Sequence, residues 1–101
     1  MKKNHDYRSF KLERLQNPDF AKVYLETVLE ESQNDSDQEA FLGALRDVVE
    51  AQGGVPEIAK RVDMPKQSLY HAFSKRGNPR MDTLSRVLKS LGLRISVEAI
   101  K

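Results

Sequence analysis

Apolar residues recur at three- and four-residue intervals through the first half of the chain, which is the period of an amphipathic helix. The pattern predicts a short, ragged helix over about residues 7–16, with Asp6 as its N-cap. Asn17 and Pro18 predict the start of a second helix that runs to about Glu31, because Asn is a favoured N-cap and Pro fits the first helical position.

A third helix is predicted after a polar loop. Ser36 and Glu39 stand three residues apart, which is the spacing of a capping box at a helix start. The helical period then continues up to Gly53 and Gly54, which are expected to end the helix because glycine readily takes a left-handed conformation. The first half is therefore expected to consist of three helices.

The second half is divided into shorter elements. The pattern predicts helices over about residues 55–62, 66–73 and 81–91, with a polar turn over residues 74–80 and with Gly92 ending the last helix. Five or six helices are thus expected in total.

Beyond Gly92 the apolar period changes from 3.6 residues to two. Leu93, Ile95, Val97 and Ala99 alternate with polar residues, so the sequence predicts a strand over about residues 93–100. A lone strand leaves its backbone groups unpaired, and we expect Leu93, Ile95 and Val97 to lie in a strand that pairs with a second copy of the chain. A strand of a different protein and an extended tail packed on the helices are the alternatives.

Composition narrows the class of protein. The 101 residues suit a single domain, and the absence of Cys excludes disulfides and thiol chemistry. No apolar run is long enough for a signal peptide or a membrane span, so we expect a soluble, cytoplasmic protein without a membrane partner.

The two halves of the chain carry opposite charge. Residues 1–50 hold seven Lys/Arg against eleven Asp/Glu, a net charge of −4, and residues 51–101 hold ten against four, a net charge of +6. Chance clustering of charges on a solvated surface would explain this asymmetry without any function. The functional explanation is that the second half of the chain binds a polyanion while the first half has another role.

Residues 55–73 have the pattern of two short helices that cross at a tight turn. Ala59 is small enough for a close crossing, and Asp63 stands where the chain must reverse with a positive φ. Pro65 is expected at the first position of the second helix, which would bury Leu69 and Phe73.

The opposite face of that second helix and the turn after it carry the side chains of a DNA reader. Gln pairs with adenine and Lys with guanine in the major groove, whereas cations and amides on exposed turns bind phosphates. The residues expected to contact bases are Lys66, Gln67, Ser68 and His71. The residues expected to contact phosphates are Tyr70, Lys75, Arg76, Asn78 and Arg80.

The segment from Gly54 to Tyr70 resembles a helix-turn-helix of the Cro/repressor type. Together with Gly77-Asn78-Pro79 and the block Val87-Leu88-Lys89-Ser90-Leu91-Gly92-Leu93, it resembles the probable addiction-module antidote proteins, the HigA-like antitoxins, over about residues 19–97.

The resemblance implies an all-α domain with a Cro/repressor-like helix-turn-helix. We expect residues 1–36 to form an acidic helical extension and residues 37–101 to form the DNA-binding domain with its C-terminal strand. The resemblance also implies a homodimer that represses its own operon at a double-stranded DNA operator and neutralises a small ribonuclease-like toxin. The chain departs from the family pattern at Asp63, Pro65 and Arg80, and Arg80 replaces a small capping hydroxyl.

Two other functions are compatible with the same sequence features. A stand-alone Cro-like regulator has the same DNA-binding features, and an interaction module with weak DNA binding would use the acidic helices or residues 93–100. His5 and His71 have no second ligand at metal spacing, so neither a metal nor a cofactor is expected. No nucleophile, base and orienting group can be assembled, which argues against an enzyme.

Overall fold

The computed structural model of the chain describes residues 2–31 and 37–101. The described chain forms six helices and no strand. The helices are α1 (Lys2–Leu15), α2 (Pro18–Glu31), α3 (Asp37–Ala51), α4 (Val55–Val62), α5 (Lys66–Ala72) and α6 (Met81–Ser90). None of them is long and apolar enough to cross a membrane.

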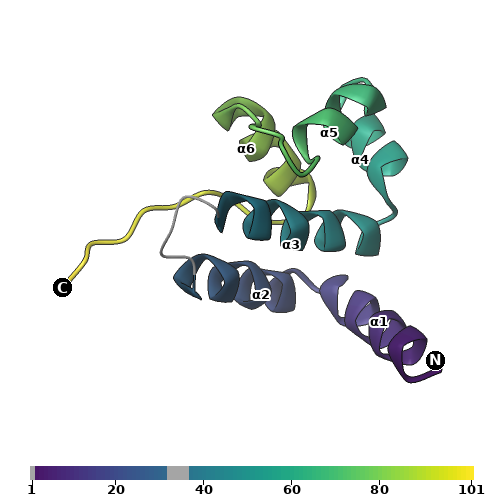
Figure 1. Cartoon of the computed structure of the whole chain (residues 1–101). Coiled ribbons are helices and arrows are strands. Elements are labelled where there is room, and N and C mark those ends of the chain that lie inside the picture. Colours follow the sequence, from purple (N-terminus) through teal and green to yellow (C-terminus); the bar gives the residue numbers. More distant parts are fainter. Residues whose placement is uncertain (1, 32–36) are drawn as a thin grey trace.

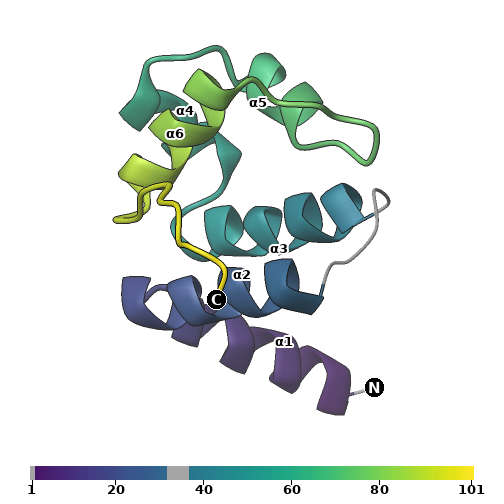
Figure 2. The ribbon, with the colours of Figure 1, turned by 90° about the vertical axis from the view of Figure 1, so that its left-hand side faces the viewer.

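Helix α3 lies in the middle of the molecule, with α1 and α2 on one side and α4, α5 and α6 on the other (Figures 1 and 2). Leu42, Leu45, Val48 and Val49 of this helix are all buried, so α3 is apolar toward both sides. The buried apolar side chains of the described residues form one cluster, whose first member along the chain is Leu15 and whose last is Leu91.

Local chemistry explains where the longer helices begin and end. The Asn17 side-chain oxygen accepts a hydrogen bond from the Asp19 backbone N–H at 2.8 Å, which confirms Asn17 as the cap of α2. Gly53 and Gly54 both have positive φ angles, and the Gly54 N–H donates to the Val49 carbonyl at 2.9 Å, which closes the end of α3. The predicted capping box at Ser36 lies outside the described residues.

The prediction for the first helix was wrong at its start. Helix α1 begins at Lys2, so Asp6 lies inside the helix and does not cap it. The residues before Tyr7 contain no apolar period from which the extra turn could be recognised, although Lys is a good helix former.

A polar cluster holds α1 against α2 and α3. The Asp47 carboxylate of α3 accepts a hydrogen bond from the Tyr24 hydroxyl at 2.8 Å and forms ion pairs with Lys11 at 3.1 Å and Arg8 at 3.6 Å. The hydrogen bond with Tyr24 and the nearby Asp47 raise the pKa of Lys11. Burial, above all, raises the pKa of Tyr24. We call these four residues the Asp47 cluster.

The predicted C-terminal strand is not present. The Leu93 N–H donates to the Leu88 carbonyl at 2.8 Å, and the chain then runs out from the helices without pairing (Figure 1). Ile95 is 38% exposed and Val97 is 94% exposed. An alternating pattern determines which side chains share a face, but the hydrogen bonds of a sheet require a second backbone alongside. No described segment of the chain lies beside this one as a strand. The prediction that Leu93, Ile95 and Val97 lie in a strand is therefore wrong for the single chain, and their pairing with a second copy stays a prediction.

Candidate nucleic-acid interface

Helices α4 and α5 are joined by a turn whose geometry depends on Asp63. This residue takes a left-handed conformation, with φ 56° and ψ 54°, and its N–H donates back to the carbonyls of Ala59 and Lys60. Asp63 is the one described residue other than glycine with a positive φ, as the sequence pattern predicts for this turn. Pro65 occupies the N-cap of α5, one position earlier than predicted.

The turn lets α4 and α5 share a small apolar contact with the core. Ala59 and Leu69 are buried, and Phe73, directly after α5, is 1% exposed. The side of α5 that carries Leu69 is thus fixed against the protein, and the rest of the helix is left on the outside of the molecule (Figure 2).

The residues expected to contact bases lie together on that outer side. Exposed side chains of α5 are Lys66, Gln67, Ser68, Tyr70 and His71. The face combines one cation, amide and hydroxyl groups and an imidazole within two helical turns, which is a set of donors and acceptors suited to base edges.

The residues expected to contact phosphates lie in the segment between α5 and α6, apart from Tyr70. Lys75 and Arg80 are more than four-fifths exposed, and they form only peripheral ion pairs, with Glu39 at 3.9 Å and with Asp82 at 3.5 Å. Arg76 and Asn78 are exposed as well. Arg80 stands at the N-cap of α6 without a capping side-chain hydrogen bond, as its identity predicts.

Two residues of α3 hold this segment in place, and neither could be recognised as a functional residue from the sequence. Arg46 donates a hydrogen bond to the Phe73 carbonyl at the end of α5. Gln38 donates to the Gly77 carbonyl at 3.1 Å and to the Asn78 side-chain oxygen at 3.3 Å. The central helix therefore fixes both the end of α5 and the loop that follows it.

Gly77 allows the loop to fold back onto α5. A Cβ at this position would lie 2.7 Å from the Ala72 carbonyl carbon and 2.8 Å from the His71 carbonyl oxygen, closer than side chains approach backbone. The Gly77 N–H donates to the Ser74 carbonyl at 2.8 Å. The loop thus needs glycine for a close approach and not for an unusual φ.

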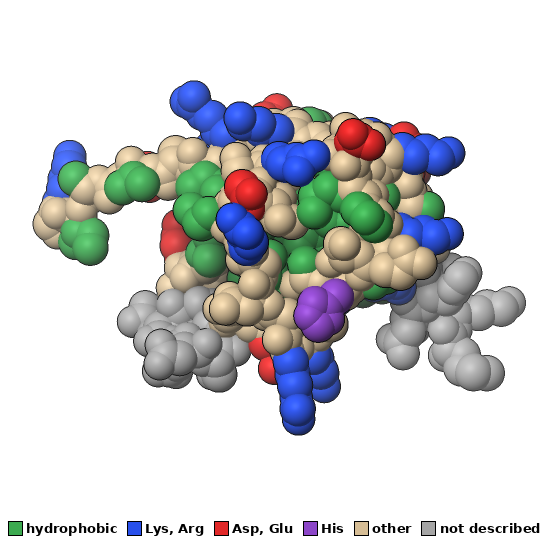
Figure 3. Space-filling model, turned by 90° about the horizontal axis from the view of Figure 1, so that it is seen from above, with side chains coloured by type: hydrophobic (Ala, Val, Ile, Leu, Met, Phe, Trp, Pro, Cys, Tyr) green, Lys and Arg blue, Asp and Glu red, His purple; other side chains and the backbone are tan. Residues whose placement is uncertain are grey.

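Basic charge in this region is not all available to a ligand. Arg61 pairs with Glu57 at 3.1 Å and donates to the Gln52 carbonyl at 3.1 Å, and Arg86 donates to the Val62 carbonyl. These two arginines tie α4 to its neighbours. Figure 3 looks onto this end of the molecule, where Lys and Arg side chains are scattered over the face and along its edge.

Among the described residues, no group of three or more His, Asp or Glu side chains lies together as a metal site. The arrangement offers hydrogen-bond donors, acceptors and positive charge on the exposed side of α5 and on the loop after it.

Comparisons with known proteins give the family. Residues 6–99 match the model of the family described as probable addiction module antidote protein. The chain is also 31% identical to an uncharacterized protein of Haemophilus influenzae over 86 residues, which cover 85% of this chain and 84% of that protein. No solved structure matches the chain. An antidote of an addiction module has a cognate toxin as its partner, and this chain belongs to the family of probable addiction module antidote proteins.

Proposed function

We propose that the chain is a sequence-specific DNA-binding repressor that acts as the antitoxin of a toxin–antitoxin pair. It would bind as a homodimer to a double-stranded DNA operator near its own gene, in the cytoplasm, and so regulate its own operon without being an enzyme. The observation that supports the proposal is that Lys66, Gln67, Ser68 and His71 are all exposed on α5, while Leu69 of the same helix is buried.

In this proposal α4 and α5 form a helix-turn-helix of the Cro/repressor type, and α5 enters the major groove. Gln67 would read adenine through two hydrogen bonds, and Lys66 would donate to guanine. Lys75 and Arg76 would hold the phosphate backbone and set the position of α5 on the duplex.

The toxin would meet the other side of the molecule. Helix α2 carries Lys22 against four acidic residues, a net charge of −3. A small, basic, ribonuclease-like toxin would complement this surface. In this division of labour, residues 1–36 serve the toxin and residues 37–101 serve the DNA.

A DNA titration tests the proposal. The purified chain is titrated by fluorescence anisotropy against the DNA upstream of its own gene and against a scrambled duplex of equal composition, at two salt concentrations. We expect a preference of about a thousandfold or more for the upstream DNA and a steep loss of affinity with salt.

Three variants separate base contacts from phosphate contacts. Gln67→Ala is expected to cost about 1–3 kcal/mol on the upstream DNA and little on the scrambled DNA. Lys75→Ala should weaken both and reduce the salt slope by about one unit. Lys22→Ala, an exposed cation on α2, serves as the control and should change neither. Equal, weak binding to both duplexes would contradict the repressor and favour a protein-interaction module.

A further inference from the structure

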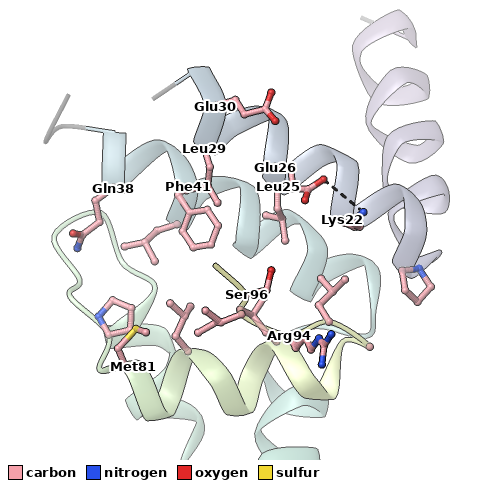
Figure 4. A pocket seen from close by; sticks show the side chains of 18 of the residues that line it. Lys22, Leu25, Glu26, Leu29, Glu30, Gln38, Phe41, Met81, Arg94 and Ser96 are labelled. Atoms are coloured by element: carbon pink, nitrogen blue, oxygen red, sulfur yellow. Dashed lines mark ion pairs between the residues drawn. The ribbon is translucent and has the colours of Figure 1, made fainter. Parts of the chain in front are cut away.

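The loop between α5 and α6 is held by the first turn of α3. The Gln38 amide nitrogen, Nε2, donates to the Gly77 carbonyl oxygen at 3.1 Å and to the Asn78 side-chain oxygen at 3.3 Å. Figure 4, which looks into the groove between α2, α3 and α6, shows the Gln38 side chain pointing from α3 toward this loop. One side chain thus contacts both the backbone of the loop and the side chain that follows.

These two contacts determine the orientation of both amide groups. A backbone carbonyl only accepts hydrogen bonds, so the part of the Gln38 amide that faces Gly77 must be its NH2 group. The same NH2 group faces Asn78, and the Asn78 atom beside it must therefore be the oxygen, Oδ1. The NH2 group of Asn78 is consequently the branch of its amide that does not face Gln38.

The Asn78 NH2 group is available to a ligand. Asn78 is exposed, and no residue that the structure describes accepts a hydrogen bond from its Nδ2 atom. The backbone of Asn78 is restricted as well, because Pro79 follows it and a proline confines the preceding residue to extended conformations. Both the backbone and the side chain of Asn78 are therefore fixed before a ligand binds.

An NH2 group fixed in this way suits an anionic oxygen. Lys75 and Arg76 precede Asn78 on the same loop and are exposed, so the loop would attract a phosphate of the DNA backbone. With the amide turned the other way, Oδ1 would face the phosphate oxygens and repel them, since both are acceptors. A contact that excludes this orientation removes the cost of turning and ordering the side chain when DNA binds.

We propose that Gln38 is a positioning residue for DNA binding, which holds the Asn78 amide with its NH2 group outward so that this group donates to a phosphate of the duplex. The inference rests on the proposed function and gives a role to a residue of α3 that would not touch the DNA itself. The central helix thereby takes part in DNA binding through the loop after α5.

A double-mutant cycle tests the proposal, because the effects of two residues that act through one contact are not additive. The variants Gln38→Ala, Asn78→Ala and the double variant are titrated by fluorescence anisotropy against the upstream DNA and the scrambled duplex. We expect Asn78→Ala to weaken binding about fivefold and Gln38→Ala about threefold on both duplexes, since phosphates are present in either. The double variant should lose about fivefold, as Asn78→Ala does alone, and not the product of about fifteenfold.

Gln52→Ala is the matched control for a purely structural role. The Gln52 Nε2 donates to the Gln16 carbonyl at 3.0 Å, so this variant also loses a hydrogen bond from a glutamine to distant backbone, but at the junction of α1 and α2. We expect Gln52→Ala to lower the urea midpoint about as much as Gln38→Ala does and to leave the DNA affinity unchanged. Gln38 and Asn78 are exposed, so their substitution leaves the core intact.

The outcomes separate this inference from the function on which it rests. A chain that binds neither duplex overturns both. If the chain binds DNA, the role of Gln38 alone is overturned when Gln38→Ala changes the affinity no more than Gln52→Ala, when Asn78→Ala binds as tightly as the wild type, or when the losses of the two single variants multiply in the double variant.

Discussion

Replacing Gly77 by Ala should loosen the loop between α5 and α6. The added Cβ would lie 2.7 Å from the Ala72 carbonyl carbon and 2.8 Å from the His71 carbonyl oxygen, so the loop must move away from the end of α5. That movement breaks the hydrogen bonds that Gly77 forms with Gln38 and with Ser74, at 3.1 Å and 2.8 Å.

The magnitude follows from these contacts. Two hydrogen bonds contribute about 1–3 kcal/mol together, and the overlap itself costs about 1–3 kcal/mol. Together the two effects give a range of about 2–6 kcal/mol. Because the loop is at the surface and can shift, we expect the lower half of this range, a loss of about 2–4 kcal/mol in the free energy of unfolding.

Urea unfolding followed by circular dichroism at 222 nm measures this loss, and Gly43→Ala is the matched control. Gly43 lies inside α3, and a Cβ there would meet only the end of the Arg46 side chain at 3.5 Å. The same substitution should therefore stabilise the chain by about 0.5–1 kcal/mol, because Ala favours the helix interior over Gly. A Gly77→Ala variant as stable as the wild type would refute the reasoning on the loop.

Three further outcomes are expected. Asp63→Ala should destabilise the fold by about 1 kcal/mol and Asp63→Gly should not, because glycine takes a left-handed φ without strain and alanine does not. The urea midpoints of the two variants measure this difference. Equal midpoints would contradict backbone strain at this turn. The raised pKa values of Lys11 and Tyr24 mean that the folded chain retains protons that the unfolded chain loses, so the free energy of unfolding should be unchanged below pH 10 and fall as the pH rises through the folded pKa values. Asp47→Asn should flatten this pH dependence in unfolding measured from pH 8 to pH 11. A variant with the same pH profile as the wild type would contradict the role of Asp47. Phe73→Ala should cost about 3–5 kcal/mol in thermal or urea unfolding because the ring is 1% exposed, and a loss below 1 kcal/mol would mean that the site is not packed as described.

Elements whose ends carry a chemical signal could be predicted from the sequence to within a residue or two. Asn17 and Pro18 begin α2, Gly53 and Gly54 end α3, and Asp63 makes the turn between α4 and α5. Each of these signals acts on the backbone of its own neighbourhood, so it can be recognised without knowing the fold.

Contacts between distant residues could not be predicted. Gln38 and Gly77 are 39 residues apart, and Arg46 and Phe73 are 27 apart, so no local pattern links the partners. The strand prediction after Gly92 was wrong for a related reason, because alternation describes side chains and says nothing about whether a second backbone lies beside them.

The attachment of α1 has a consequence for the order in which the molecule opens. Of the described side chains of α1, from Tyr7 to Leu15, only that of Leu15 is buried, and the other contacts of α1 with α2 and α3 include the Asp47 cluster, the ion pair of Arg8 with Glu50 and the stacking of Arg14 on the Phe20 ring. Much of the attachment of α1 is therefore electrostatic. Such a contact is weakened by salt, whereas the apolar packing around α3 is not. Native-state hydrogen exchange should therefore detect α1 as a separate unit that unfolds before the rest, with amide protection that falls as ionic strength rises.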